Sequence, residues 1–398
     1  MRLLFHGGSV VDPVTGPAVA DVAVEDGRIV DVGSGLDGDE AVDCTGKHLL
    51  PGLFDCHVHV AVTHIDIWRR AHTPFSYNFY LAIENLQATL AAGITSVRDA
   101  GGADLGMKEA VDHGLIAGPR MQIAINMLSQ TGGHGDGWLP SESRIHFVPP
   151  YPGHPAAIVD GPDEMRRKVR ELIRAGADVI KVATSGGVLS PRDEPSEAHF
   201  RPEELAVLVE EAAAAGRWVM AHAQAADGVK NAIRAGIRSI EHGIYLDDEA
   251  ISLMLEHGTY LVPTLVAPTG VLRAVEAGAS IPPASVLKAE QVREDHRASF
   301  ARAVDAGVRI AMGTDSAVTP HGENLAELEL MVEGGMTERA TLEATTIEAA
   351  RLLGVEDELG SIEPGKIADL VVVDGDPYDF ASLRERIEQV WKDGVRAV

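Results

Sequence analysis

The sequence predicts an α/β fold, namely a (β/α)8 TIM-like barrel with a small β-sandwich domain formed from both termini. Three observations predict it: a helix–glycine–apolar unit recurs through the middle of the chain, hairpin patterns occupy both ends, and 45% of the 398 residues are hydrophobic. This length exceeds one ordinary domain but suits a barrel with a satellite domain. We expect a discontinuous β-sandwich over residues 1–50 and 357–398 and a barrel over residues 51–356.

Both ends of the chain have the pattern of short strands joined by tight turns. Asp26-Gly27 separates alternating apolar residues, which is a strong hairpin signal. Near the other end, residues 368–373 form an apolar run, and Asp393-Gly394 separates two further short runs. Neither end has enough strands to bury a sheet face alone, so we expect both to build one shared domain.

A repeated unit fills the region between the two ends. In each copy a helical stretch ends in Ala-Gly or His-Gly, a few apolar residues follow, and a polar residue closes the run. Glycine just past a helix end supplies the left-handed residue that terminates the helix. The apolar runs are too continuous for half-exposed strands, so they predict buried ones. The copies lie at residues 92–99, 175–181, 215–222, 235–242, 257–264 and 306–315.

Helices alternate with these runs, at residues 162–175, 202–213 and 247–256. A strand before His57 and another at residues 120–125 bring the number of predicted strands to eight. Alternating strands and helices of this number predict the barrel, whose active sites lie at the C-terminal ends of the strands. The polar residues that close the strands are therefore expected to meet at one rim.

Two segments interrupt the alternation. Residues 128–162 are rich in Gly, Pro, His and aromatic residues and show no periodicity. A loop of this length in a compact fold is usually functional or disordered, and we expect it to cover the barrel mouth as a lid. Residues 264–283 are expected to form a loop with a short helix.

The overall charge restricts the choice of partners. The chain has 34 Lys and Arg residues against 60 Asp and Glu residues, a formal charge of −26, which repels nucleic acids and anionic membranes. No signal-peptide pattern and no apolar run of membrane-spanning length is present, so we expect a cytoplasmic protein. Cys44 and Cys56 are the only cysteines and do not suggest a disulfide framework. Cys56 should face away from His57 along the strand and serve in packing.

Five strand-end residues indicate a metal site. His57 and His59 are two residues apart, so on a strand both side chains point to the same face. His222, His242 and Asp315 close the fifth, sixth and eighth predicted strands. Imidazole nitrogen and carboxylate oxygen are donors that zinc or manganese accept. A single histidine of this kind is most often structural, but five at one rim favour a metal centre.

Lys181 lies within the fourth of the eight predicted strands, where an unpaired ammonium would be costly. Burial would lower its pKa and free an amine that can react with carbon dioxide, giving an anionic carbamate able to bridge two cations. The alternative is an ordinary ion pair with Asp178 or Glu241. Composition alone favours that ion pair.

The ordered set of strand-end residues resembles the amidohydrolase superfamily, in particular its binuclear members with a carboxylated lysine. Motifs around Lys181, His242 and Asp315, and the segment 361–370 that returns to the β domain, narrow the resemblance. They are similar to the group of imidazolonepropionase-like hydrolases, Xaa-Pro and Xaa-Arg/Lys dipeptidases, ochratoxin amidase, and phenylurea or carbamate hydrolases. The set, in chain order, is His57, His59, Lys181, His222, His242 and Asp315.

The resemblance implies how these residues share two divalent metal ions, with zinc expected and manganese or cobalt as alternatives. His57, His59 and Asp315 would hold one ion, and His222 and His242 the other. Carboxylated Lys181 and a hydroxide would bridge the two ions. Such a pair polarises a carbonyl and lowers the pKa of a bound water.

The resemblance also implies two catalytic side chains. Asp315 would accept the proton of the nucleophile and pass it to the leaving amine. His134, in the lid, would stabilise the oxyanion or bind a substrate carboxylate. The other interpretation of His134, an exposed histidine among glycines, is about equally supported by the sequence.

Some positions depart from related patterns. Mononuclear deaminases of the superfamily need a glutamate three residues after the fifth-strand histidine, where this chain has Ala225. Gln224 stands where basic-residue carboxypeptidases often have tyrosine, so specificity for a C-terminal amino acid is not assumed. Arg98, Arg192 and Tyr245 are further candidate substrate contacts, although such arginines are more often salt-bridge partners.

The sequence therefore predicts a metal-dependent hydrolase of an amide-type C–N bond. Its small-molecule substrate would be a dipeptide, an N-acyl amino acid, or a small aryl amide or carbamate. Esterase or lactonase activity at the same site is the alternative, and a catalytically silent scaffold is a hypothesis from another class. We expect a homo-oligomer that binds neither nucleic acid nor membranes.

Overall fold

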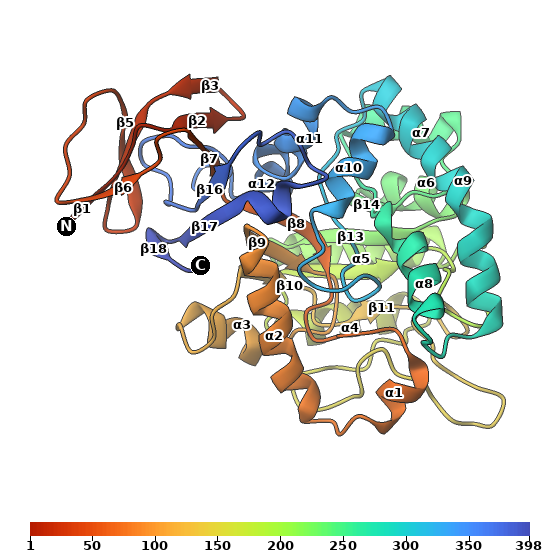
Figure 1. The fold of residues 1–398 in the computed structure, drawn as a ribbon. Coiled ribbons are helices and arrows are strands. Elements are labelled where there is room, and N and C mark those ends of the chain that lie inside the picture. The colour runs from red at the N-terminus through yellow and green to blue at the C-terminus, as the bar shows by residue number, and fades with distance from the viewer.

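The computed structural model describes residues 1–398, and the two ends of the chain come together in a pair of β-sheets (Figure 1). One sheet has the strand order β5-β4-β1-β6 and the other β18-β17-β16-β7-β2-β3. A hydrophobic cluster of 13 buried residues, including Phe5, Ile29, Leu370 and Trp391, draws on strands from both sheets. The strands are β1 (Arg2–His6), β2 (Ser9–Asp12), β3 (Gly16–Val19), β4 (Asp21–Glu25), β5 (Arg28–Gly33), β6 (Glu40–Asp43), β7 (Lys47–Pro51), β16 (Leu370–Asp374), β17 (Ile387–Lys392) and β18 (Val395–Arg396).

Two hairpin turns from opposite ends of the chain touch each other. Asp26 and Gly27 have φ values of 49° and 77°, and Asp393 and Gly394 have values of 53° and 71°, as a two-residue turn with both central residues left-handed requires. Both predicted hairpins are confirmed, because β4 pairs with β5 and β17 with β18 in antiparallel register. A Cβ placed on Gly27 would lie 2.8 Å from the Asp393 carbonyl oxygen.

The rest of the strands form two open parallel sheets, with orders β10-β9-β8 and β11-β12-β13-β14-β15. The main chain near residues 309–316 lies between the two, since Ile310 bridges Leu261 of β15 and Ser316 bridges Val58 of β8. At the other edge the Asp178 amide, just before β12, donates to the Ile123 carbonyl of β10. The strands are β8 (Leu53–Val58), β9 (Ile94–Asp99), β10 (Arg120–Ile123), β11 (Met127–Leu128), β12 (Val179–Ala183), β13 (Trp218–Ala223), β14 (Ser239–His242) and β15 (Tyr260–Val262).

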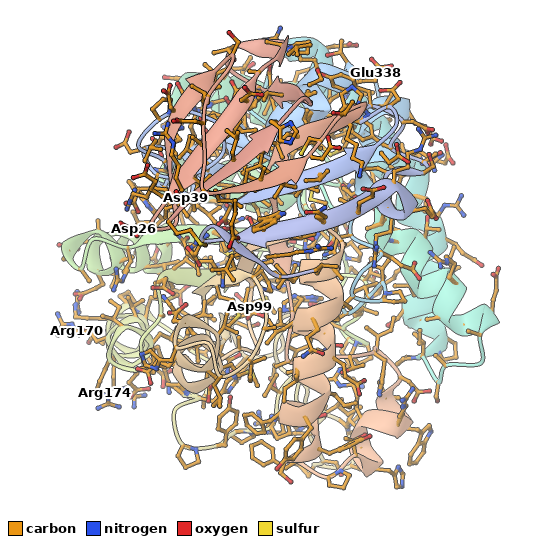
Figure 2. The ribbon with its side chains drawn as sticks, turned by 60° about the vertical axis from the view of Figure 1, so that its left-hand side comes forward. Asp26, Asp39, Asp99, Arg170, Arg174 and Glu338 are labelled. Carbon is orange, nitrogen blue, oxygen red and sulfur yellow. The ribbon has the colours of Figure 1, made fainter.

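Helices follow most of these strands and surround them (Figure 1). The predicted glycine terminators are confirmed: Gly236 and Gly307, for example, have φ values of 93° and 82° at helix ends. In Figure 2, Arg170 and Arg174 project from α4 on the outside of the molecule. No helix is both long enough and apolar enough to cross a membrane. The helices are α1 (Ile67–His72), α2 (Tyr77–Ala91), α3 (Leu105–Asp112), α4 (Pro162–Arg174), α5 (Pro202–Ala214), α6 (Ala226–Ala235), α7 (Asp248–His257), α8 (Val266–Glu276), α9 (Pro283–Ala306), α10 (Ala326–Glu333), α11 (Glu338–Ala344), α12 (Ile347–Leu353) and α13 (Leu383–Arg386).

The segment after β15 differs from the expected loop with a short helix, because α8 occupies eleven of its residues. Pro268 and Gly270 within α8 weaken the helical signal in the sequence. The helix begins where the buried carboxylate of Glu327 accepts the amides of Leu265 and Val266 at 2.7 and 2.9 Å. A side-chain carboxyl group that accepts the first amides of a helix caps it, and this one comes from a distant part of the chain.

We predict that Gly27→Ala destabilises the protein by about 2 kcal/mol or more, because the new side chain would meet the Asp393 carbonyl in addition to straining a left-handed residue. Gly16→Ala is the matched control, since Gly16 has a φ of 83° but nothing within 4 Å of its would-be Cβ. Urea unfolding measures the free energy of unfolding of both variants. Equal losses for the two variants would contradict the contact between the turns.

Glu327 also predicts a pH dependence of stability. Burial raises its pKa from 4.5 to about 8, and the Leu265 and Val266 amides offset only part of this effect. The folded state therefore holds the proton more tightly than the unfolded state, and this contribution to stability is lost as the pH rises from about 4.5 to about 8. Relative to Glu327→Gln, the free energy of unfolding of the natural protein should fall by roughly 1 kcal/mol per pH unit in this range. If the free energies of unfolding of the two proteins changed in parallel with pH, Glu327 would not be the group that titrates.

Candidate metal centre

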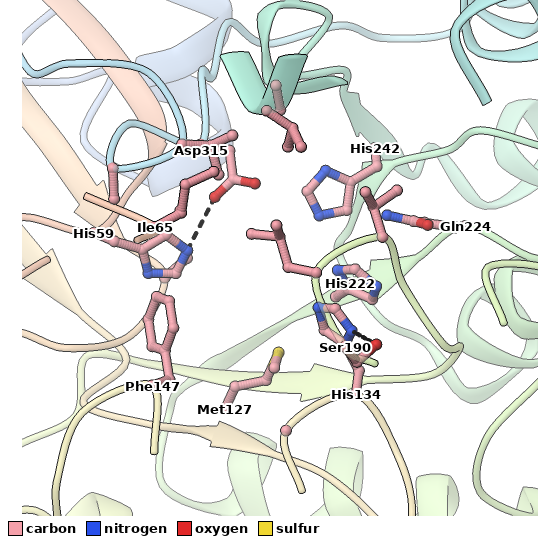
Figure 3. A pocket seen from close by; sticks show the side chains of 18 of the residues that line it. His59, Ile65, Met127, His134, Phe147, Ser190, His222, Gln224, His242 and Asp315 are labelled. Atoms are coloured by element: carbon pink, nitrogen blue, oxygen red, sulfur yellow. Dashed lines mark hydrogen bonds and ion pairs between the residues drawn. The ribbon is translucent and has the colours of Figure 1, made fainter. Parts of the chain in front are cut away.

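The six predicted ligands all line one cavity at the ends of the strands. His57, Lys181 and His222 lie within β8, β12 and β13, His242 ends β14, and His59 and Asp315 follow a strand or strand-like segment. Figure 3 shows His59, His222, His242 and Asp315 around the cavity. The backbone turns sharply at two of them, since His242 and Asp315 have φ values of 74° and 59°. Non-glycine residues adopt this conformation rarely, and such positions cluster at functional sites.

Three of the six are already close enough to hold one ion. The ligand atoms of His57, His59 and Asp315 all lie within 4.8 Å of one another. Asp315 Oδ1 is 3.1 Å from His59 Nε2 and 3.7 Å from His57 Nε2. Burial alone would raise the pKa of Asp315, but the hydrogen bond from His59 and the nearby His57 and Lys181 charges hold it below its usual value. An ionised carboxylate beside two imidazoles is a suitable donor set for a divalent cation.

The first two histidines each have Nδ1 bound to an acceptor behind the ring, which turns Nε2 towards the cavity. His57 Nδ1 lies 2.8 Å from the buried carboxylate of Glu241, and His59 Nδ1 lies 2.7 Å from the Gly101 carbonyl oxygen. Both partners can only accept, so Nδ1 carries a proton and Nε2 is the atom that can ligate a metal, where a cation would replace the proton that His59 Nε2 shares with Asp315. Metal-ligating histidines have this arrangement.

The other two histidines are arranged in the same way with different atoms. His222 Nε2 donates to the Gly186 carbonyl oxygen at 3.1 Å, which leaves Nδ1 as the donor atom for a metal. His242 Nδ1 lies 2.7 Å from Thr264 Oγ1, which leaves Nε2. Burial holds the pKa values of both rings, and that of His57, well below the usual value. Neutral imidazoles with a free lone pair fit a metal centre.

Lys181 lacks the counter-ion that the simpler interpretation requires. Its side chain is buried, and Nζ has only His57 Nε2 as a polar neighbour, at 3.5 Å. Asp178 pairs instead with Lys108 at 2.7 Å, and Glu241 with Arg98 at 2.9 Å. Burial lowers the pKa of Lys181 to about 8, against the opposing charges of Glu241 and Asp315. A pKa of about 8 gives this lysine a much larger fraction of neutral, reactive amine than an ordinary lysine has.

His134 lies in the cavity wall and is not an exposed loop residue. Its ring stacks on His222 with a centroid distance of 4.1 Å and an angle of 14°. Nδ1 lies 2.8 Å from Ser190 Oγ, whose hydroxyl donates to the buried carboxylate of Asp193. Gly187 makes room for the ring, because a Cβ there would lie 2.2 Å from His134 Cε1. Ser190, Asp193 and Gly187 had no recognisable signal in the sequence.

The remaining candidate substrate contacts divide into two groups. Gln224 lines the cavity. Arg98, Arg192 and Tyr245 do not line it. Arg98 is buried between strands and binds Glu241. Arg192 lies over the Trp138 ring, and Tyr245 packs against an apolar cluster. Arg98 thus has the salt-bridge role that arginines at strand ends more often have.

Much of the remaining cavity wall is apolar. Of 33 lining residues 15 are hydrophobic, among them Ile65, Met127 and Phe147 (Figure 3). Phe147 belongs to the segment 128–162, several of whose residues line the cavity, and its ring packs edge-on against His59 at 4.7 Å. Such a wall suits a substrate with a hydrophobic group next to its reacting bond.

Comparison with known proteins supports this site. The model of a protein family described as "Amidohydrolase family" matches residues 48–398. An ochratoxinase from Aspergillus niger is 37% identical over 367 residues, which cover 87% of this chain and 75% of that protein. A structure of a Xaa-Pro dipeptidase with methionine bound in its active site has a TM-score of 0.89 at 34% identity, over 100% of this chain and 99% of that one. The crystal structure of the A. niger ochratoxinase has a TM-score of 0.87 at 33% identity, over 99% and 95% of the two chains.

These likenesses extend over the whole fold, which is a TIM-like barrel with an additional domain. They also agree with the predicted chemistry, the metal-dependent hydrolysis of an amide-type C–N bond. Because the family match and the ochratoxinase alignment both cover most of the sequence, the chain belongs to the amidohydrolase family.

Proposed function

We propose that this enzyme cleaves a small amide with a hydrophobic group beside the reacting bond, such as a dipeptide, an N-acyl amino acid, or an aryl amide or carbamate. The observation that carries the proposal is the gathering of six potential ligands in one cavity whose wall is largely apolar. The ochratoxinase and Xaa-Pro dipeptidase relatives, named for amide substrates of this kind, support the same class.

The proposed cofactors are two divalent cations, with zinc favoured by the nitrogen-rich donor set. His57, His59 and Asp315 would hold one, and His222 and His242 the other. The Nε2 atoms of His57, His59 and His242 and the Nδ1 of His222 support this division, because the other nitrogen of each ring is held by a partner behind it. When bound, the ions supply Lewis acidity that polarises the scissile carbonyl and acidifies a water molecule.

Lys181 is proposed to carry a carbamate. The ammonium first loses one proton, the neutral amine attacks carbon dioxide to form a C–N bond, and a second proton leaves to solvent, so the side chain changes from a cation to an anion. Its burial, the lack of a carboxylate partner and a pKa lowered to about 8 all favour this reaction. The anion would lie beside His57, between the two ligand groups.

Proton transfer is proposed to use Asp315, and charge stabilisation His134. Asp315 Oδ would take the proton of the attacking water and return it to the leaving nitrogen. The Ser190 contact holds Nδ1 of His134 away from the cavity, so Nε2 is the atom nearest the substrate. To stabilise a substrate oxygen or carboxylate, Nε2 must also carry a proton, and Asp193, 3.8 Å from Nδ1, would be the counter-ion of that imidazolium.

Further features of the architecture remain proposals. We infer that the two terminal sheets form a β-sandwich, because they share one hydrophobic cluster. Residues 1–50 and 357–398 would form this domain, and residues 51–356 the catalytic barrel. The segment 128–162 would act as a lid, an interpretation supported by its place in the cavity wall.

The metal centre is tested by a hydrolysis screen of dipeptides, N-acyl amino acids, carbamates and lactones on metal-loaded protein. We expect amide hydrolysis, and a loss of at least about 100-fold in activity together with a loss of bound metal in Lys181→Ala, because the bridging anion is gone. A carbamate signal from ¹³C-labelled bicarbonate should appear in the natural protein and vanish in this variant.

Lys108→Ala is the control for the metal centre, since Lys108 is paired with Asp178 outside the cavity. It should keep its metal content and the carbamate signal. Full activity and two bound metals in Lys181→Ala would rule out the bridge. Cleavage of lactones without amides would favour the esterase alternative.

The role of His134 is tested at Gly187. Gly187→Ala would place a methyl group 2.2 Å from His134 Cε1 and displace the ring from its stack on His222. We expect kcat/KM to fall by about 100-fold, as for loss of one oxyanion donor, with metal content unchanged. Adding His134→Ala should cause little further loss, because both changes remove the same interaction. Multiplicative losses would show that Gly187 acts in another way.

A further inference from the structure

One cationic side chain in the cavity wall has no anionic partner. Arg70, on α1, donates through Nη2 to the main-chain carbonyls of His146, at 2.6 Å, and Phe147. Its guanidinium carbon lies 5.4 Å from the centre of the Phe147 ring. Arg70 takes part in none of the ion pairs of the structure, although these include pairs as long as 4.0 Å.

Two other arginines near the cavity, Arg98 and Arg144, are neutralised by carboxylates. Arg98 binds Glu241 at 2.9 Å, and Arg144 binds Asp136 at 3.2 Å. At Arg70, burial lowers the pKa to about 10, and no neighbouring carboxylate opposes this effect. A partly buried guanidinium without a counter-ion is costly, and a ligand anion would remove that cost.

The Arg70 guanidinium has N–H donors that make no hydrogen bond to the protein. Only Nη2 contacts the protein, and Nε and Nη1 are not among the polar atoms sealed from solvent without a partner. A guanidinium presents its N–H groups in a planar fork that matches a carboxylate. The contacts to the His146 and Phe147 carbonyls therefore orient the group without saturating it.

Arg70 also lies at a suitable place relative to the metal ligands. It lines both the main cavity and an adjoining pocket, and Ile67 and Phe147 are shared by both as well. The Phe147 ring contacts His59 and Arg70, so one aromatic ring separates the guanidinium from the metal centre. A substrate that reaches from the metal ions along this wall would end near Arg70.

We propose that Arg70 binds a carboxylate of the substrate, so that the enzyme selects amides that carry a free carboxylate beyond their hydrophobic group. This inference rests on the proposed amide hydrolysis and specifies its substrate class. The net charge of −26 repels anions at long range, so a local cation is needed to hold them in the cavity.

Binding of two probes to the metal-loaded enzyme tests the proposal. Hydrocinnamate and hydrocinnamyl alcohol differ only in the carboxylate, and neither can be hydrolysed. We expect the natural protein to bind hydrocinnamate about tenfold more tightly by calorimetry, as for a charge-assisted hydrogen bond. Arg70→Met should abolish this preference and keep the affinity for the alcohol, and Arg70→Lys should retain part of the preference.

Arg69→Met is the matched control, because Arg69 is the exposed neighbour on the same helix, and it should behave as the natural protein. A preference that survives in Arg70→Met would place the carboxylate on the metal ions and overturn the proposal. Equal binding of the two probes by the natural protein would overturn it as well.

Kinetics separate this inference from the proposed function. With carboxylate-bearing amides, Arg70→Met should raise KM about tenfold and leave kcat nearly unchanged, and neutral amides should be unaffected. Efficient hydrolysis of neutral amides without any carboxylate preference would keep the proposed function and reject the role of Arg70. A carboxylate preference in a protein that hydrolyses no amide would support the anion site and reject the proposed function.

Discussion

The candidate site depends on one buried carboxylate, that of Glu241. It is fully buried on β14, and it binds Arg98 of β9 and His57 of β8, so that it joins three strands that are far apart in sequence. The ion pair with Arg98 keeps the carboxylate charged in a place where an unpaired charge would be very costly. A charged acceptor then fixes the proton of His57 on Nδ1 and turns Nε2 to the cavity. Because Glu241 pairs with Arg98, it forms no ion pair with Lys181.

Burial gives the cavity its chemical character. The histidines that line it stay neutral because an imidazolium would lose its hydration there. The same effect lowers the pKa of Lys181 to about 8 and so increases the fraction of reactive neutral amine. Carbonyl, carboxylate and hydroxyl partners behind the rings hold one nitrogen of each, so the other nitrogen is turned towards the cavity before any ion binds.

The cavity wall is assembled from segments outside the strands. Phe147 and His134 come from the long segment between β11 and α4, Ser190 from the loop after β12, and Arg70 from α1. These segments contact one another through a few specific interactions, such as the Arg70 contacts to the Phe147 carbonyl and the Ser190 contact to His134. Loops that carry substrate contacts on a rigid strand scaffold are the usual arrangement in barrel enzymes.

The sequence by itself determined the order of strands and helices, the pairing of the two chain ends and the residue types at the strand ends. These follow from local physics: glycines at Gly236 and Gly307 stop helices, Asp-Gly turns form hairpins, and alternation places His57 and His59 on one face. Only the tertiary structure decided the free nitrogen of each histidine, the lack of a partner for Lys181, the helix α8 that Glu327 caps, and the place of Arg70. Each of these depends on an atom contributed from a distant part of the chain, and neither spacing nor propensity along the sequence carries that information.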